Sequence, residues 1–358
     1  MKILGIETSC DETAASVVEL TGAAQGVHLF SNAVASSMDL HAQYGGVIPE
    51  IAARSHIESI LPVVRQALED AKCGWSDIDA IAVTQGAGLG GSLLIGVLTA
   101  RTLAIAKDKP LYACNHVEGH VYANFITGTS LPGYAVRQEP PAFPMLAVIV
   151  SGGHSQLVLF RDHFNYTLLG QTQDDAIGEA FDKVAKITGL PYPGGPSVAR
   201  AAENGDARAF ALPKAKMGGK YDFSFSGLKT AVLRQAQAMI GKDYTFPSKD
   251  LPERLVEAQK ANIAATFQRV AIETIVDKAV LAAEEFSPAS VVIAGGVAAS
   301  TELRKQLSER LTSPLEFPDL KLCTDNGAMI AALGAYKALS GQPAADPYSL
   351  DISPNLSM

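Results

Sequence analysis

The sequence predicts an α/β protein built from two similar lobes. The same β-hairpin pattern opens both halves of the chain, and in each half a Gly-rich turn joins an apolar strand to a helix. A Pro-rich segment separates the halves. At 358 residues the chain is also too long for one ordinary core, which favours two domains.

The hairpin pattern occurs first at residues 2–20, which read as a strand, a small polar turn and a second strand. Residues 145–160, MLAVIVSGGHSQLVLF, repeat it with SGGH as the turn. An amphipathic helix is expected after Pro49, because apolar residues recur there at three- and four-residue spacing. A second long helix is expected within residues 254–286.

The Gly-rich turns lie within residues 78–106 and 289–311. Each is followed by what reads as a further strand entering a helix, at 110–124 in the first half and at 320–336 in the second. This correspondence predicts that His116 and Asp325 take equivalent positions in the two lobes and face one cleft between them.

The segment 133–144, GYAVRQEPPAFP, is the expected connector. We expect lobes at 1–135 and 144–334, with a C-terminal helix from about 335 to 358 returning to the first lobe. This organisation is typical of the actin-like, sugar kinase and Hsp70 ATPase (ASKHA) superfold. Such proteins hold a nucleotide phosphate between the two hairpin turns, where small residues let backbone N–H groups approach the anion.

Composition limits the function classes. No apolar run nears the ~20 residues of a membrane span, and the amino-terminal sequence turns acidic without an apolar signal segment, so we expect a cytoplasmic protein without membrane contact. The four cysteines form no C-x-x-C pair, which favours reduced thiols. The net charge of −8 argues against binding nucleic acid through bulk charge.

A role with RNA therefore needs a local basic patch. The best candidate is the segment 213–234, in which two phenylalanines could stack a base or fill the core. Its basic residues are Lys214, Lys216, Lys220, Lys229 and Arg234, and the phenylalanines are Phe223 and Phe225.

The stretch NHVEGHVYAN places His116 and His120 four residues apart. On a helix this spacing lets two imidazoles converge on one cation. A zinc protease would carry H-E-x-x-H, with its general-base Glu directly after the first His, whereas Glu118 stands two residues along. The segment therefore lacks the general base of a zinc protease. A metal site and an ordinary polar helix both remain possible interpretations.

Eight motifs read together resemble the TsaD family in its bacterial form, over residues 2 to about 335. That family transfers threonylcarbamoyl to N6 of adenosine 37 in the anticodon loop of transfer RNAs that read ANN codons. The motifs are GIETSCDET, YGGVIPEIAARSH, NHVEGH, VSGGHSQL, DDAIGEAFDKVAKITGLPYPGGP, DFSFSGLKT, AGGVAAS and CTDNGAMIA.

The resemblance implies one divalent metal ion, with Fe²⁺ favoured and Zn²⁺ as the alternative, held by His116, His120 and Asp325 with coordination positions left open. It also implies an adenylate or ATP ligand in the cleft. The implied ligand contacts are Ile149, Val150, Ser151, Gly152, Gly153, Asp182, Gly195 and Ser300.

Several of these positions have alternatives. Asp182 could instead pair with Lys186 at i+4 on a helix surface. Ser300 stands where the family usually has Asn, and it could instead cap the following helix. Ala199 stands where many relatives carry Asp, so one sugar contact is in doubt.

The implied substrate is threonylcarbamoyl-AMP. Asp11 and Glu12 are candidates to take the N6 proton, although both could be solvated turn residues. The implied partners are transfer RNA, a TsaB-like paralogue and a TsaE-like ATPase. Two other functions stay open at this point: a small-molecule kinase of the same superfold, and a non-catalytic scaffold paralogue.

Overall fold

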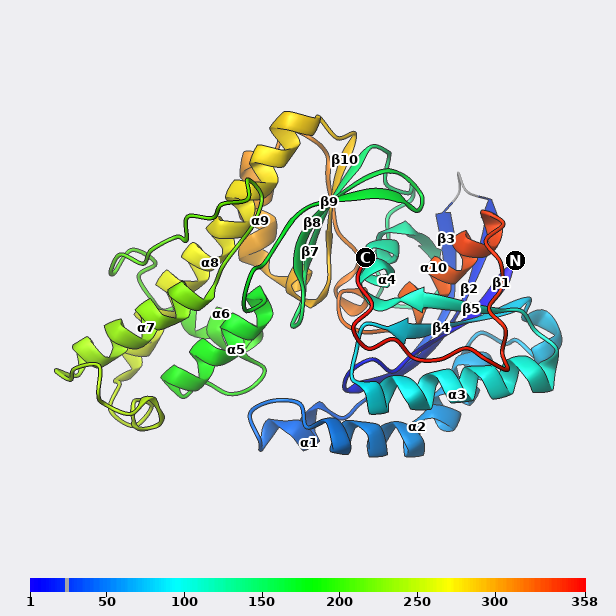
Figure 1. Ribbon diagram of the computed structural model, residues 1–358, viewed down its shortest axis with the longest axis horizontal. Helices are drawn as coiled ribbons and strands as arrows, with labels where there is room; N and C mark the ends of the chain where they lie inside the picture. Colours follow the sequence, from blue (N-terminus) through cyan, green and yellow to red (C-terminus); the bar gives the residue numbers. More distant parts are fainter. Residues whose placement is uncertain (23–25) are drawn as a thin grey trace. The chain divides into compact units, whose positions relative to one another are not determined.

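The computed structural model describes residues 1–22 and 26–358, and its chain divides into two units (Figure 1). Unit 1 comprises Met1–Ala142 with Glu316–Met358, and unit 2 comprises Phe143–Leu315. The boundary at Ala142 falls inside the expected connector, which forms neither helix nor strand. The second lobe ends earlier than expected, since residues 316–334 group with unit 1 rather than with unit 2.

Unit 1 is built on a six-stranded sheet in the order β5-β4-β1-β2-β3-β6. β1 pairs antiparallel with β2 and parallel with β4. The strands are β1 (Lys2–Glu7), β2 (Glu12–Gly22), β3 (Gly26–Ser36), β4 (Ala80–Gly86), β5 (Leu111–Asn115) and β6 (Ile126–Thr129). The helices are α1 (Met38–Ala42), α2 (Pro49–Asp70), α3 (Gly90–Lys107), α4 (His116–Tyr122) and α10 (Gly327–Leu339), with short 3-10 turns at Trp75–Asp77, Ala123–Phe125 and Leu320–Leu322.

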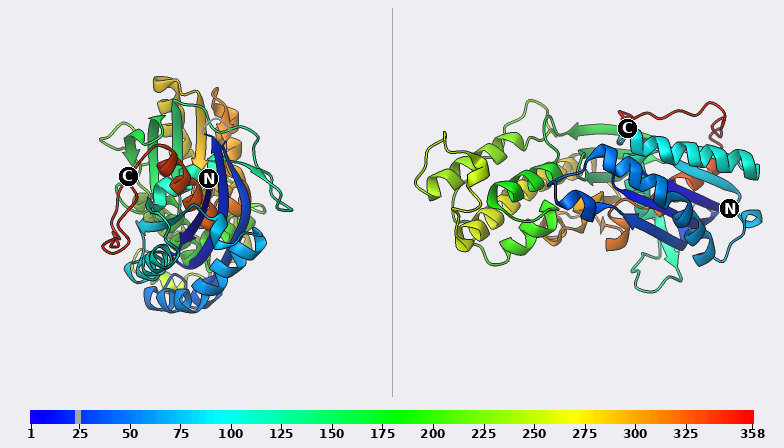
Figure 2. Two further views of the ribbon diagram at one scale, coloured as in Figure 1. Left: turned by 90° about the vertical axis from the view of Figure 1, so that its right-hand side faces the viewer. Right: turned by 90° about the horizontal axis from the view of Figure 1, so that it is seen from below.

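Helices cover both faces of this sheet. Leu4 and Ile6 of β1 join the core cluster formed with α2 and α3, which pack against each other (Figure 2). Gly5 faces the other way, where a Cβ would lie 2.2 Å from the carbonyl oxygen of Gly327 at the start of α10. Because successive residues of a strand point to opposite faces, β1 is buried on both sides.

One helix, α3, is long and apolar enough by length and composition to cross a membrane. It packs against α2 and β4, with Leu93, Val97 and Ala100 among its buried residues.

Unit 2 is built on a five-stranded sheet in the order β11-β10-β7-β8-β9. The strands are β7 (Met145–Val150), β8 (Ser155–Asp162), β9 (Asn165–Gln171), β10 (Ser290–Ala294) and the short β11 (Leu315–Glu316). The helices are α5 (Ile177–Thr188), α6 (Gly194–Ala202), α7 (Ser226–Met239), α8 (Glu257–Phe286) and α9 (Thr301–Arg310), with 3-10 turns at Ser248–Asp250 and Gly296–Ala299.

The two sheets share a core order, β4-β1-β2-β3 in one unit and β10-β7-β8-β9 in the other. In both, a hairpin is followed by a strand that pairs parallel with the hairpin's first strand. Both predicted hairpins, both strands that enter Gly-rich turns, and the predicted helices α2 and α8 are therefore confirmed.

The last expected repeat element is wrong. The segment that read as a strand contains a 3-10 helix, Leu320–Leu322, and by sheet order the counterpart of β5 is β11. The helix that follows, α10, packs on β1 and β2 of unit 1. Asp325 consequently lies in the same unit as His116, not in the opposite lobe as the repeat predicted.

The expected helix from about 335 to 358 is also wrong beyond Leu339, where α10 ends. Three prolines in residues 340–358 cannot donate helical hydrogen bonds, and this tail forms no helix. It does run along unit 1: Ala345 donates its N–H to the carbonyl of Leu111 at 2.7 Å, and the guanidinium of Arg101 donates to three carbonyls of residues 347–350.

Candidate metal centre and ligand pocket

The two histidines lie on α4, which begins directly where β5 ends. The side chain of Asn115 caps this helix by accepting the N–H groups of Val117 at 2.8 Å and Glu118 at 3.2 Å. The rings of His116 and His120 are both buried, with centroids 4.7 Å apart. The predicted i, i+4 pairing on one helix face is therefore formed.

Asp325 reaches this pair from the turn before α10. Its Oδ1 lies 3.6 Å from Nε2 of His116 and 3.3 Å from Nε2 of His120. The neighbouring Asn326 holds the turn, since its amide donates to the carbonyls of Leu322 and Thr324 and its oxygen accepts the N–H of Met329. One ligand atom from each of the three predicted residues lies within 4.8 Å of the others.

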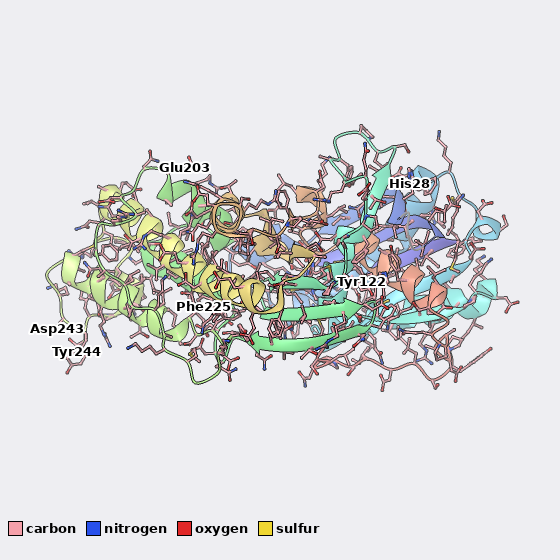
Figure 3. The ribbon with its side chains drawn as sticks, turned by 90° about the horizontal axis from the view of Figure 1, so that it is seen from above. His28, Tyr122, Glu203, Phe225, Asp243 and Tyr244 are labelled. Carbon is pink, nitrogen blue, oxygen red and sulfur yellow. The ribbon has the colours of Figure 1, made fainter. Side chains whose placement is uncertain are left out.

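Close packing of α4 on α10 makes this approach possible. A Cβ at Gly119 would lie 2.8 Å from Cδ1 of Ile330, so only glycine fits there without displacement. Tyr122, at the end of α4, packs its ring 5.4 Å from that of Tyr336 on α10 (Figure 3). The metal group thus depends on a contact between segments about 200 residues apart in the chain.

The donor set fits a divalent cation. Apart from the 3.3 Å approach of Nε2 to Asp325, neither buried ring nitrogen of His120 has a hydrogen-bond partner among the described residues. A buried polar atom without such a partner is costly, and binding of a metal ion would relieve that cost. Two imidazoles and one carboxylate match a transition metal such as Fe²⁺ or Zn²⁺. Glu118 does not belong to this group; its burial raises its pKa, which the charge of Lys337 partly offsets.

His116 has a strongly perturbed protonation equilibrium. Burial lowers its pKa, but the negative charges of Asp325 and Glu7 outweigh burial and raise the pKa to about 9. Glu7, the last residue of β1, is a buried carboxylate that the sequence analysis missed. Its position as an acidic residue ending an apolar strand, KILGIE, was the available signal.

The two candidate proton acceptors lie on the β1–β2 turn of the same unit. Burial, followed by the negative charges of Asp325 and Asp11, raises the pKa of Glu12 to about 10. The carbonyl of Asp11 accepts hydrogen bonds from the N–H and the hydroxyl of Ser37. Glu12 is itself half-buried, so it is not a freely solvated turn residue.

A buried histidine supports this turn from α2. Nε2 of His56 lies 3.0 Å from the carbonyl oxygen of Cys10, and its Nδ1 lies 2.8 Å from Oγ1 of Thr13. The carbonyl can only accept, so Nε2 carries the proton and Nδ1 accepts from the Thr13 hydroxyl. Burial lowers the pKa of His56, which agrees with this neutral form.

Unit 2 contains a cavity of about 500 Å³. Its wall combines the starts of α6 and α9 with one face of α5 and a residue of α8. Of the eight predicted ligand contacts, the four that line it are Gly152, Asp182, Gly195 and Ser300. Ala199, whose departure from the family pattern was noted, also lines it.

The other four predicted contacts do not line this cavity. Ile149 and Val150 are fully buried within β7. Ser151 is turned into its own hairpin, where its Oγ accepts the N–H of His154 at 3.1 Å. Gly153 has open space around its Cβ position, so no neighbour within this unit explains a glycine there.

For Asp182 and Ser300, the structure tests the alternative roles that the sequence left open. Asp182 accepts the N–H of Gly194 at 2.7 Å, which ties α5 to the start of α6, and the described residues contain no ion pair between it and Lys186. Ser300 does cap α9, accepting the N–H of Leu303 at 3.3 Å. Its hydroxyl proton stays available to a ligand, so the cap and the ligand role are compatible.

Five further polar residues line the cavity: Tyr192, Arg200, Glu203, Gln268 and Thr301 (Figure 3 labels Glu203). Gln268 lies on α8, far from any motif. Its contribution follows from the packing of α8 on α6 and had no signal in the sequence.

The basic segment is less cationic than its sequence suggests. Lys214 pairs with Glu273 and Asp277, Lys220 pairs with Glu285, and Lys229 pairs with Asp175. Of the two alternatives for Phe223 and Phe225, filling the core is confirmed, because both side chains are buried.

Comparison with known proteins identifies close relatives. A model of the TsaD family, described as tRNA N6-adenosine threonylcarbamoyltransferase, matches residues 28–332. The tRNA N6-adenosine threonylcarbamoyltransferase of Thermomicrobium roseum is 50% identical over 348 residues, which cover 95% of this chain and 93% of the relative. The protein of that name from Dehalococcoides mccartyi is 46% identical over 362 residues, covering 100% of this chain and 99% of the relative.

A solved structure of full-length HypF in the phosphate- and nucleotide-bound form aligns with a TM-score of 0.56 at 14% identity, covering 96% of this chain and 47% of HypF. At that identity the likeness concerns the fold alone, and it agrees with the predicted ASKHA superfold. The family model and the full-length relatives establish the family: this chain belongs to the TsaD family of tRNA N6-adenosine threonylcarbamoyltransferases.

Proposed function

We propose that this protein transfers threonylcarbamoyl from threonylcarbamoyl-AMP to N6 of adenosine 37 in transfer RNAs that read ANN codons. The full-length identity to named transferases carries this proposal. N6 attacks the carbamoyl carbon, the bond from that carbon to the phosphate oxygen breaks, AMP departs, and N6 loses one proton. The kinase and scaffold alternatives are not favoured, because the relatives carry the transferase name over nearly the whole chain.

His116, His120 and Asp325 would hold the divalent ion, with Fe²⁺ favoured over Zn²⁺. The close approach of their ligand atoms and the unpartnered nitrogens of His120 support this assignment. A bound ion would supply Lewis-acid stabilisation of charge on the carbamoyl oxygen or on the departing phosphate.

The proton from N6 would pass to the β1–β2 turn. Burial, followed by the negative charges of Asp325 and Asp11, raises the pKa of Glu12. Asp11 and Glu12 both remain candidates to accept this proton.

The adenosine part of the adenylate would bind in the cavity of unit 2. Its volume of about 500 Å³ suits a nucleoside, and its lining combines apolar walls with a few polar groups. Asp182 can accept from ribose hydroxyls, Ser300 can donate to the base or sugar, and Gly195 lies in open space where a flat base can approach. The side chains of Ile149 and Val150 would not contact this ligand, because both are buried within β7.

Transfer RNA is the substrate that the family implies. We propose that partners contribute to its binding, because the basic segment is largely ion-paired within the chain. A TsaB-like paralogue would fit the neighbouring helices α2 and α3, which expose the apolar side chains of Ile57, Leu61, Leu94 and Leu98. We also propose a TsaE-like ATPase partner and a cytoplasmic location, where transfer RNA is modified.

The test supplies threonylcarbamoyl-AMP and unmodified transfer RNA to the protein with its partners, and measures threonylcarbamoyladenosine by nucleoside mass spectrometry. The wild type is expected to form the modified nucleoside, and His120→Ala is expected to form little. Phosphorylation of a small molecule from ATP without nucleoside formation would favour the kinase. Stimulation of another transferase without turnover by this chain would favour the scaffold.

A further inference from the structure

We propose that Glu7 is a positioning residue that sets which ring nitrogen of His116 binds the metal. This inference rests on the metal centre of the proposed function and extends it to a residue outside the ligand set. Glu7 is a buried carboxylate that is neither a proposed metal ligand nor a candidate proton acceptor.

Glu7 is fully buried at the carboxyl end of β1, where an unpaired carboxylate would be costly. Its Oε1 accepts the N–H of Ser9 at 2.5 Å, and its Oε2 accepts the hydroxyl of Thr84 at 2.5 Å. Oε2 also lies 3.2 Å from Nδ1 of His116. Two strands and the helix α4 thus meet at one side chain.

The chemistry of these contacts determines a tautomer. An ionised carboxylate only accepts, so Nδ1 of His116 must carry the proton that it shares with Glu7. When a metal ion is bound, the lone pair of Nε2 would point to it, and Nε2 is the nitrogen that lies 3.6 Å from Oδ1 of Asp325. A histidine that donates its second N–H to a carboxylate is a common arrangement behind a metal ligand, because it fixes the ring and increases the basicity of the binding nitrogen.

Ser9 offers an alternative acceptor. Its Oγ lies 3.0 Å from Nδ1 of His116 and could take the same proton, or donate one and reverse the tautomer. Glu7 excludes the reversed arrangement because it cannot donate. The carboxylate therefore decides the direction of the hydrogen bond, and the hydroxyl adapts to it.

Glu7→Gln tests this with little change of shape. The amide oxygen must face the N–H of Ser9, which leaves the NH₂ group against Thr84 and Nδ1 of His116. The NH₂ donates to Nδ1 and moves the ring proton to Nε2, where it blocks metal binding. We expect Zn²⁺ affinity, measured by competition with a chelator, to fall roughly 10- to 100-fold, the usual effect of such outer residues. Bound Co²⁺ should show an altered visible spectrum.

Two matched variants separate positioning from stability. Thr84→Val removes another hydrogen bond to Glu7 without touching His116, so it should lower the melting temperature but keep Zn²⁺ affinity within a few-fold. Ser9→Ala should also keep the affinity. Unchanged Zn²⁺ affinity and Co²⁺ spectrum in folded Glu7→Gln would overturn the proposal, and so would a larger loss in Ser9→Ala than in Glu7→Gln.

A measurement on the unaltered protein guards against a variant that does not fold. In the Zn²⁺-loaded wild type, ¹⁵N-edited imidazole spectra should show the His116 proton on Nδ1, and a proton on Nε2 would overturn the proposal. Failure of the wild type to bind Zn²⁺ at all would reject the metal centre itself. Normal metal binding without nucleoside formation would instead reject the proposed transfer reaction and leave the Glu7 assignment standing.

Discussion

His56→Leu should damage the turn that carries Asp11 and Glu12 without touching either carboxylate. The change removes the hydrogen bond to the carbonyl of Cys10 and the acceptor of the Thr13 hydroxyl. A buried polar group left without a partner costs about 1–3 kcal/mol. The Cys10 carbonyl still accepts from Ser92 at 3.2 Å, so we expect a total loss of about 2–4 kcal/mol in the free energy of unfolding.

Urea unfolding measures this loss, and nucleoside mass spectrometry measures transfer. Transfer should fall at least tenfold under conditions where the variant is still folded, because the turn is no longer held against α2. His28→Leu is the control: His28 (labelled in Figure 3) lies on β3 of the same unit, where it pairs with Glu19, far along β2 from Glu12 and the turn. Unchanged stability and unchanged transfer in His56→Leu would refute the reasoning.

The pH dependence provides a second check on the same residue. Because burial lowers the pKa of folded His56, the unfolded chain binds a proton more readily than the folded chain. The stabilisation is complete above the unfolded pKa of about 6.5 and is lost as pH falls towards the folded pKa. Between pH 7 and 5, the unfolding free energy of His56→Leu should decrease less steeply than that of the wild type.

Three further sets of substitutions test the metal centre, the cavity and the RNA surface. Glu118→Gln should retain Zn²⁺ whereas His120→Ala loses it; loss in both, by elemental analysis, would contradict the ligand assignment. Ser300→Ala should weaken adenylate binding in calorimetry and cost about 0.5–2 kcal/mol of stability through the lost cap to Leu303, while Asn should preserve both. Lys216→Glu should lower transfer RNA affinity and its salt slope more than reversal of an ion-paired neighbouring lysine; equal effects would contradict this.

Local patterns account for most of what the sequence predicts correctly. The hairpins follow from alternating apolar residues on either side of small polar turns, and α2 follows from its apolar spacing after Pro49. The His pair on α4 follows from i, i+4 spacing alone. Each of these features depends on residues within about twenty positions of one another, so periodicity suffices.

Long-range packing accounts for what the sequence predicts wrongly. Residues 320–322 have an apolar pattern short enough for a strand, whereas the packing of α10 on β1, β2 and α4 returns the chain to unit 1. The basic segment fails for a related reason. The carboxylates that neutralise Lys214 and Lys220 stand on α8, roughly sixty residues later, and no local pattern associates them.

Two buried polar residues, Glu7 and His56, stand where the packing of the core alone would favour apolar side chains. Glu7 and His56 occupy positions in a strand and a helix that also contribute to the core, where an apolar side chain would be more stabilising unless the polar group had partners. Both have partners at every hydrogen-bonding atom, and those partners include a proposed metal ligand in one case and the turn with the proposed proton acceptors in the other. Burying Glu7 and His56 is less favourable for stability than burying apolar side chains, and both lie next to the candidate site. Stability alone therefore does not explain these two residues. The local geometry of these contacts is what the Glu7 and His56 variants measure.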